Sequence, residues 1–194
     1  MMKSIFVTGT DTGVGKTIIS SSVAAYLSVV KGLDVGVMKP FESGIETTED
    51  RGFDDTWILK KASGSQDAVN EINPYLFKAP LAPEAAAAEE GASIEIDLVT
   101  SVYDRLTARH DVLIVEGAGG LLVPITDGFF YADLIRAWNA PVIVVSRLTL
   151  GTINHTLLTC GHLRSIGAKV LGVILNDTEG AGDIASQTNP AMLK

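Results

Sequence analysis

The sequence predicts an α/β fold in which a mainly parallel sheet carries helices on both faces. Three observations lead to this prediction. Short apolar runs recur along the chain, segments with helical spacing separate them, and the first run leads directly into a glycine-rich turn and a helix. Strands that alternate with helices form parallel sheets covered on both sides, and such sheets bind ligands at the carboxyl ends of their strands.

The strands are predicted from five short apolar runs, several of them rich in β-branched residues. Each run is apolar on both faces, as expected for a buried parallel strand. The predicted strands are residues 4–8, 35–38, 112–115, 142–146 and 170–175.

Helical patterns lie between these strands. Residues 15–31, 97–109 and 154–166 show apolar side chains near helical spacing, and a short helix is expected to begin at Ala85. Residues 73–83 are interrupted by prolines and predict a structured loop. The expected apolar positions are Ile18, Ile19, Val23, Leu27 and Val30 in the first helix, Leu98, Val102 and Leu106 after a cap at Asp97 in the second, and Leu157, Leu158 and Cys160 to Leu163 in the third.

Residues 5–17 have the order strand, glycine-rich loop, helix that a phosphate-binding loop requires. The glycines let backbone N–H groups converge on phosphate oxygens, and the helix N-terminus adds its positive dipole end. Lys16 would reach the β- and γ-phosphates, and the Thr17 hydroxyl would ligate Mg²⁺. The strict pattern has glycine at position 10, where this chain has Thr10, and Gly9 lies one residue earlier. The motif predicts binding of a nucleoside triphosphate in a P-loop NTPase-like fold.

Composition narrows the class of protein. The 194 residues, of which 46% are hydrophobic and 20% charged, suit one globular domain, and a net charge of −8 opposes binding to nucleic acid or an anionic membrane. Cys160 is the single cysteine, which excludes an internal disulfide and a cysteine metal cluster and predicts a buried helical thiol. No signal peptide or apolar run of roughly 20 residues is found, so we expect a cytoplasmic protein.

Polar residues directly follow three of the predicted strands, and a parallel sheet would bring them to one edge. Glu116 after the third strand suggests a magnesium ligand, although a solvated loop carboxylate is the alternative. Lys39 after the second strand offers a second cation for a transferring phosphoryl group, although an exposed lysine is the alternative. Asp54 and Asp55 begin a helix-like stretch, and either residue could simply cap that helix. The remaining residues at this edge are Pro40, Glu42, Ser43, Gly44, Gly117 to Gly120, Asn176 and Asp177.

These residues together resemble the dethiobiotin synthetase family, in family order and over nearly the whole chain. The phosphate loop alone is compatible with many ATPases, whereas the full set is highly specific. The matching segments are Thr-Gly-Thr-Asp-Thr-Gly-Val-Gly-Lys-Thr at 8–17, Lys-Pro at 39–40 with Ser43-Gly44, Asn-Pro-Tyr at 73–75, Val-Glu-Gly-Ala-Gly-Gly at 115–120, Ala-Asp-Leu at 132–134, Leu-Gly-Thr-Ile-Asn-His at 150–155 and Asn-Asp at 176–177.

The resemblance implies an ATP- and Mg²⁺-dependent cyclo-ligase that makes dethiobiotin from 7,8-diaminononanoate and CO₂. The route it implies runs through a carbamate and a carbamic–phosphoric anhydride. It also implies a homodimer, in which a helix N-terminus of the partner holds the carboxylate of the diamine.

Site residues are carried over by their match to the family's motifs. Lys39 and Lys16 match catalytic lysines, and Thr17, Asp55 and Glu116 match magnesium ligands. The nucleotide and phosphate contacts match Gly13, Val14, Gly15, Lys16, Thr17, Gly117, Ala118, Gly119, Asn176 and Asp177, with Asn176 reading the base. The substrate contacts match Thr12, Ser43, Gly151, Thr152 and Asn154.

The chain departs from the family pattern at two places. Position 13 is glycine where some relatives carry glutamate, which leaves the backbone cradle intact. The family usually continues past residue 194 with a loop that holds base and ribose, whereas residues 179–189 here are glycine-rich and polar. We therefore expect a single domain over residues 1–194 that lacks the usual C-terminal nucleotide-contacting segment.

Three alternatives fit parts of the pattern. Partition and division-site ATPases have similar loops, but they carry a lysine five residues before the invariant one, where this chain has Asp11. An amide-forming ligase of cobalamin synthesis would need an amidotransferase domain with a nucleophilic cysteine, for which 194 residues leave no room. A non-catalytic remnant of the synthetase is the third alternative, because the tail is short.

Overall fold

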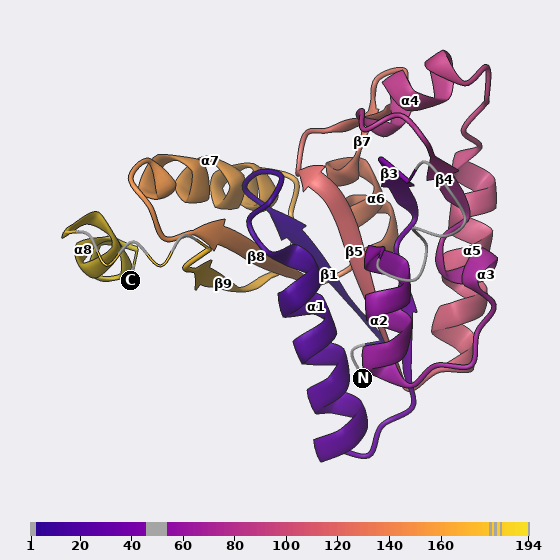
Figure 1. The fold of residues 1–194 in the computed structure, drawn as a ribbon, viewed down its shortest axis with the longest axis horizontal. Helices are drawn as coiled ribbons and strands as arrows, with labels where there is room; N and C mark the ends of the chain where they lie inside the picture. The colour runs from indigo at the N-terminus through magenta and orange to yellow at the C-terminus, as the bar shows by residue number, and fades with distance from the viewer. Residues whose placement is uncertain (1–2, 46–53, 179, 181, 183, 194) are drawn as a thin grey trace.

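The computed structural model describes residues 3–45, 54–178, 180, 182 and 184–193. Its main sheet has five parallel strands in the order β2-β5-β1-β8-β9, which confirms the predicted fold class (Figure 1). All five predicted strands form, but β5 continues to Gly120 and so includes Glu116 to Gly120, which were expected to follow the strand. The five strands are β1 (Ser4–Gly9), β2 (Val35–Met38), β5 (Val112–Gly120), β8 (Val142–Arg147) and β9 (Val170–Asn176).

Helices and two small sheets surround this main sheet. The helices are α1 (Lys16–Ala25), continued by the π-helical η1 (Tyr26–Val30), α2 (Asp55–Ser63), α3 (Val69–Ile72), α4 (Pro83–Glu89), α5 (Ile96–Arg109), α6 (Tyr131–Trp138), α7 (Thr152–Ser165) and α8 (Ile184–Met192). The parallel pair is β3 (Phe41–Ser43) with β4 (Tyr75–Phe77), and the antiparallel pair is β6 (Pro124–Thr126) with β7 (Phe129–Phe130).

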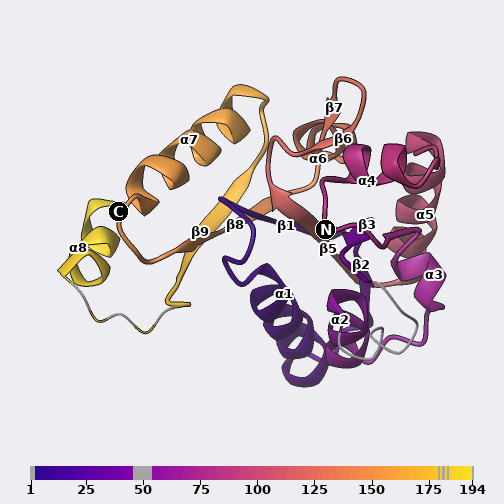
Figure 2. The same ribbon diagram turned by 45° about the horizontal axis from the view of Figure 1, so that its top comes forward.

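The core lies on both faces of the sheet because neighbouring residues of a strand point to opposite sides. Ile5 and Val7 of β1 join a cluster that includes side chains of α1 and α2, whereas Phe6 joins the cluster on the side of α5, α6 and α7. Figure 2 shows α1 and α2 on one side of the sheet and α6 and α7 on the other. The prediction of helices on both faces is therefore confirmed.

The three long helices form as predicted, but the buried stripe is wrong at several positions. Ile18 and Val30 are 61% and 64% exposed, while Ile19, Val23 and Leu27 pack against the core. These three residues are four apart, so they lie above one another on one helix face. The spacing of apolar residues gives the helical period, whereas the neighbouring elements decide which face is buried.

The residues predicted to be buried on α5 and α7 are also wrong in part. Leu98 is exposed, and the buried stripe of α5 is Val99, Val102, Tyr103 and Leu106. Asp97 lies in the first turn instead of at the cap, which is Glu95. In α7 the expected Leu157 and Leu158 are exposed, and the buried residues are Thr152, Thr156, Cys160 and Leu163. The predicted burial of Cys160 is confirmed.

The expectation that every main strand is buried on both faces is wrong for β9. Leu171 and Val173 are 40% and 36% exposed. β9 is an edge strand, and α7 packs against it while α1 packs against β1 and β5 further along the sheet. A continuous apolar run is therefore compatible with a strand that is covered on one face.

Short elements account for most of what the sequence did not predict. The predicted loop at residues 73–83 contains β4, which pairs with β3 through contacts that are distant in sequence. α6 was not predicted, although Asp133 Oδ2 accepts the backbone N–H of Phe130 at its start. α8 lies in the polar tail, whose expected first residue, Glu179, is outside the described residues. Within the described ranges, no helix combines the length and apolar character that a membrane crossing requires.

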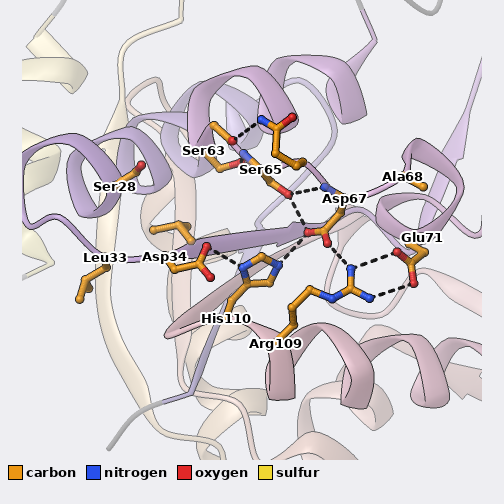
Figure 3. A pocket seen from close by; sticks show the side chains of 13 residues that line it. Ser28, Leu33, Asp34, Ser63, Ser65, Asp67, Ala68, Glu71, Arg109 and His110 are labelled. Atoms are coloured by element: carbon orange, nitrogen blue, oxygen red, sulfur yellow. Dashed lines mark hydrogen bonds and ion pairs between the residues drawn. The ribbon is translucent and has the colours of Figure 1, made fainter.

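A cluster of polar side chains ties the elements together at the end of the sheet opposite the phosphate loop. It lines an open cavity of about 520 Å³ (Figure 3). His110, after α5, places Nε2 2.8 Å from Asp67 Oδ2 and Nδ1 2.9 Å from Asp34 Oδ1. A Cβ on Gly36 would lie 2.4 Å from the His110 ring, so glycine makes room for that ring.

Asp67 is the centre of this cluster. Its carboxylate also accepts hydrogen bonds from Ser65 and from Arg109, which in turn contacts Glu71 at 3.1 Å. Burial alone would raise the pKa of the Asp67 carboxyl, but the hydrogen bonds from Ser65, Arg109 and His110 outweigh burial and lower that pKa. The polar groups of these side chains are hydrogen-bonded to one another, so we interpret the cluster as a structural link between α5, α3 and β2.

We expect Asp67→Asn to lower the free energy of unfolding at pH 7 by about 2 kcal/mol, because it weakens charge-assisted hydrogen bonds. A carboxyl group whose pKa is lowered by folding stabilises the protein above its unfolded pKa and loses that contribution as the pH falls through the folded pKa. The difference between the two proteins should therefore shrink below about pH 4. Urea unfolding at pH 7 and pH 3 measures it, with the exposed Asp104→Asn as control. The same difference at both pH values would contradict the assignment.

Candidate active site

The phosphate loop connects β1 to α1 at the carboxyl edge of the main sheet (Figure 1). Gly13 and Gly15 have φ angles of 70° and 92°, in the left-handed region that favours glycine. A Cβ on Gly9 would lie 2.9 Å from both the Asp11 carbonyl oxygen and a methyl carbon of Val14. This close packing explains why position 9 requires glycine in this variant loop.

Lys16 extends back along the loop and is 7% exposed. Its Nζ donates to the carbonyl oxygen of Asp11 at 3.0 Å. Burial and the positive charge of Lys39 lower the pKa of Lys16 to about 8, against the opposing charges of nearby carboxylates. No described side chain caps the start of α1, so its first N–H groups are available to an anion.

A second group, here called the acid–lysine cluster, consists of Lys39, Asp55, Glu116 and Thr17. Lys39 Nζ lies 2.8 Å from Asp55 Oδ2 and 2.5 Å from Glu116 Oε1. The Thr17 hydroxyl donates to Glu116 Oε1 at 3.0 Å. Four side chains that were predicted from separate segments therefore lie in contact. Lys39 directly follows β2, Glu116 lies in the middle of β5, and Thr17 and Asp55 lie in the first turns of α1 and α2.

Lys39 and Asp55 hold each other in their ionised forms. Burial alone would lower the pKa of Lys39, but the charges of Glu116 and Asp55 outweigh burial and raise it. Burial alone would raise the pKa of Asp55, but the charge and hydrogen bond of Lys39 outweigh it and lower that pKa. Lys39 and Glu116 are 3% and 0% exposed, so removing Lys39 would leave the buried Glu116 carboxylate without a counter-charge, whereas removing Glu116 would leave Lys39 with Asp55 alone.

The side chains of this cluster fit a magnesium ion. Glu116 Oε2 is buried and has no hydrogen-bond partner among the described residues, so one carboxylate oxygen has an unused lone pair. Among those residues no group of three His, Cys, Asp or Glu side chains could hold a metal. Mg²⁺ does not need such a group, because it usually binds one or two carboxylates together with phosphates and water. Asp55, Glu116 and the Thr17 hydroxyl suit that chemistry.

The backbone of Lys39 is fixed by the Asn-Pro-Tyr segment that follows α3. Lys39 N–H donates to the carbonyl oxygen of Ile72 at 2.8 Å. The Asn73 side chain donates to the carbonyl oxygens of Lys39 at 2.8 Å and Tyr75 at 2.9 Å. The start of the predicted loop at residues 73–83 therefore supports the backbone of the lysine that follows β2.

The glycines after Glu116 belong to β5 and allow close packing. A Cβ on Gly117 would lie 3.1 Å from the Phe6 ring. Gly119 has a φ of 62°, and a Cβ there would lie 2.8 Å from Val123 and 3.5 Å from the Thr12 hydroxyl. Ala118 and Gly119 are half-buried at this edge. Their predicted contacts with phosphate or substrate stay predictions.

Asn176 lies directly on the phosphate loop. Its side-chain nitrogen donates to the carbonyl oxygen of Val14 at 2.9 Å, and a Cβ on Gly15 would lie 2.1 Å from that nitrogen. Asp177 is exposed and accepts the N–H of Gly180 at 2.8 Å. The structure thus brings Asn176 to the nucleotide loop, and its predicted reading of the base stays a prediction.

The predicted substrate-carboxylate segment forms the start of α7. Gly151 and Asn154 are exposed, as a contact with a second molecule would require. Thr152 is 3% exposed, and its hydroxyl donates to the carbonyl oxygen of Arg147 at 2.5 Å and lies 2.7 Å from Ser146 Oγ. The Thr152 side chain therefore points into the protein and leaves only its backbone for a ligand. Ser43, the other predicted substrate contact, is half-buried on β3.

Arg147 is a charged residue of this edge that the sequence analysis missed. Its Nη2 donates to the carbonyl oxygen of Thr12 at 2.8 Å and lies 3.4 Å from Asp11 Oδ2. Arg147 follows the predicted strand 142–146 directly. Lys39, Glu116 and Asn176 were predicted because each directly follows a predicted strand, and Arg147 meets the same criterion.

The chain matches a family model described as an AAA domain over residues 3–193. The ATP-dependent dethiobiotin synthetase of Bacillus velezensis is 44% identical over 193 residues, which cover 100% of this chain and 82% of that protein. The ATP-dependent dethiobiotin synthetase of Aquifex aeolicus is 42% identical over 190 residues, which cover 98% of this chain and 83% of that protein.

Solved structures that resemble this chain are more distant in sequence. The kinase domain of the Escherichia coli tyrosine kinase ETK has a TM-score of 0.55 at 16% identity and covers 93% of this chain and 69% of that chain. A GTPase from Pyrococcus abyssi has a TM-score of 0.55 at 13% identity and covers 98% of this chain and 74% of that chain. At these identities the likeness shows the fold alone, which is that of P-loop NTPases.

We expect Gly15→Ala to weaken binding of a non-hydrolysable ATP analogue at least ten-fold, and Gly13→Ala to weaken it much less. Both substitutions place a side chain in the left-handed region, at a similar cost of about 1–2 kcal/mol. Only the Cβ at position 15 displaces Asn176, since a Cβ at position 13 meets nothing nearer than Arg147 at 4.0 Å. Titration calorimetry measures the difference, and equal losses in the two variants would contradict this account.

Proposed function

Because the chain belongs to the family of ATP-dependent dethiobiotin synthetases, we propose that it converts 7,8-diaminononanoate and CO₂ into dethiobiotin with Mg²⁺ and ATP. The chain is an ATP-dependent ligase of biotin synthesis.

The proposed reaction has three steps. One amine of the substrate attacks CO₂, which forms a C–N bond and, after loss of a proton to solvent, a carbamate. A carbamate oxygen then attacks the γ-phosphorus of ATP and displaces ADP, giving a carbamic–phosphoric anhydride. The second amine attacks the carbonyl carbon of that anhydride, forms the second C–N bond and expels phosphate, and its proton is released. Phosphorylation is needed because a carbamate is a poor acylating agent.

Beyond family membership, one observation carries the proposal: a second buried lysine, Lys39, lies at the same edge as Lys16 of the phosphate loop. A phosphoryl group in transfer spreads negative charge over three oxygens, and preorganised cations stabilise that charge. Lys16 would act from the loop that cradles ATP, and Lys39 from the side of the attacking carbamate. The ion pairs of Lys39 with Asp55 and Glu116 keep its ammonium charged and oriented.

The Mg²⁺ of the proposal would be held by Thr17, Asp55 and Glu116. When bound there, the ion would neutralise part of the charge on the transferring phosphate oxygens. The unused oxygen of Glu116 supports this assignment. The exposed start of α7, with Gly151 at its cap, supports a homodimer in which this helix end of one protomer holds the carboxylate of the diamine bound by the other.

The decisive experiment measures phosphate release from Mg·ATP and bicarbonate, with and without 7,8-diaminononanoate, and follows the ureido product by mass spectrometry. Release that depends on the diamine, with an equal amount of product, would support the synthetase. Release that is indifferent to the diamine would point to an ATPase switch. No release would point to a non-catalytic remnant.

We expect Lys39→Ala to lower turnover about 10²- to 10³-fold, the usual cost of losing one donor to a transition state. Binding of ATP should change less, because Lys39 faces the acceptor side. Steady-state kinetics and nucleotide titration separate the two effects, and circular dichroism shows whether the variant folds with Glu116 unpaired. Lys61→Ala, at an exposed lysine of α2, is the matched control. Turnover within a few-fold of the parent would remove Lys39 from the mechanism.

A further inference from the structure

Glu42 is a buried carboxylate to which the proposed function assigns no role. It is the middle residue of β3, between the core side chain of Phe41 and the half-buried Ser43, and it is 5% exposed. Both of its oxygens contact the first turn of α2. Oε1 accepts the backbone N–H of Asp55 at 2.7 Å, and Oε2 accepts the hydroxyl of Thr56 at 2.5 Å.

The start of α2 is therefore held at consecutive residues. The N–H groups in the first turn of a helix have no acceptor within the helix, and negative charge near them is favourable. Asp54 supplies one acceptor locally, since its carboxylate accepts the N–H of Trp57 at 2.8 Å. Glu42 supplies another from a different element. Its two bonds restrain the rotation of the first turn and hence the direction in which the Asp55 side chain leaves the helix.

That direction matters because Asp55 joins the acid–lysine cluster from α2, outside the main sheet. Lys39 and Glu116 are fixed by β2 and β5, whereas Asp55 depends on how α2 is docked. Glu42 lies three residues after Lys39, on the same short segment. The segment that carries the ammonium group thus also binds the backbone of its carboxylate partner, 2.8 Å from Lys39 Nζ.

Glu42 is suited to this task because its carboxylate is engaged by hydrogen bonds. Burial raises its pKa, opposed by the hydrogen bond from Thr56 and the charge of Lys39. A buried carboxylate is costly unless such partners compensate it. Here a backbone N–H, a hydroxyl and a nearby ammonium charge do so, and the same contacts connect β3 to α2.

We infer that Glu42 is a positioning residue: by binding the backbone of Asp55 it sets the place of the Asp55 carboxylate beside Lys39 and toward the Mg²⁺ of the proposed function. The inference rests on the proposed function, because it takes Asp55 to be a ligand of that ion. Glu42 acts through the start of α2 and does not itself bind metal, nucleotide or diamine.

The test compares Glu42→Met, which keeps the approximate size but loses both carboxylate acceptors, with Glu42→Gln, which keeps one oxygen for the Asp55 N–H. Binding of Mn²⁺ in the presence of a non-hydrolysable ATP analogue is measured from the electron paramagnetic resonance signal of free Mn²⁺. We expect Glu42→Met to weaken Mn²⁺ binding about ten-fold, as loss of a group supporting a metal ligand commonly does. Glu42→Gln should stay within about two-fold, and nucleotide affinity without metal should not change. Unchanged Mn²⁺ binding in Glu42→Met would overturn the inference.

An Asp55→Asn variant separates this inference from the proposed function. In the Asp55→Asn background, Glu42→Met should weaken Mn²⁺ binding by less than about two-fold, because residues that act through one group are not additive. If Asp55→Asn weakens Mn²⁺ binding and Glu42→Met does not, the role of Glu42 fails and the function stands. If Asp55→Asn has no effect, the metal assignment fails, and the inference fails with it.

Two further measurements exclude a merely structural effect. Hydrogen exchange by NMR should show faster exchange of the Asp55 amide in Glu42→Met, with the amides of α5 unchanged. Glu89→Met, at an exposed glutamate of α4, should leave Mn²⁺ binding unchanged.

Should Glu42→Met fail to fold, Thr56→Val removes one of the two contacts and is expected to weaken Mn²⁺ binding about three-fold. Unchanged binding in that variant would equally overturn the inference.

Discussion

The buried contact between the Lys39 ammonium and the Glu116 carboxylate is the interaction on which the rest of the site depends. Glu116 lies within the central part of the sheet with no exposed surface, so its charge requires a partner. Lys39 supplies that partner from the end of β2, and Asp55 and Thr17 complete the group from two helix starts. Four segments distant in sequence thereby converge on a few ångströms at the carboxyl edge of the sheet.

The main sheet could be predicted because buried parallel strands are continuous apolar runs, which can be recognised in the sequence without knowing what packs against them. The burial of individual side chains could not be predicted, because it depends on the elements that pack against each strand. Leu171 and Val173 are as apolar as the residues of β1, yet they lie on an edge strand that α7 covers on one side. Single positions of the helices were wrong for the same reason: in α5 the expected Val102 and Leu106 are buried, but Leu98 is exposed and Val99 is buried beside them.

The residues of the candidate site were largely predictable because one geometric rule brings the ends of parallel strands to one edge. Lys39 directly follows β2 and Asn176 ends β9, whereas Glu116 was expected after its strand and lies inside the longer β5. Arg147 ends β8 and was missed because the rule was not applied to the fourth predicted strand. Glu42 is a different case. Its contact is with a backbone N–H thirteen positions away, and no residue type in the sequence marks such an acceptor.

The two lysines of the edge are in opposite electrostatic situations, and this contrast is what suits them to different tasks. Lys39 is compensated by two carboxylates, which raise its pKa and hold its position. Lys16 is buried with a carbonyl oxygen as its acceptor, and Lys39 helps to lower its pKa to about 8. The charged form of an ammonium group placed in this way is strongly stabilised by an anion that binds beside it. A polyphosphate bound along the start of α1 would supply that charge, so nucleotide binding and the stability of the charged loop lysine would reinforce each other.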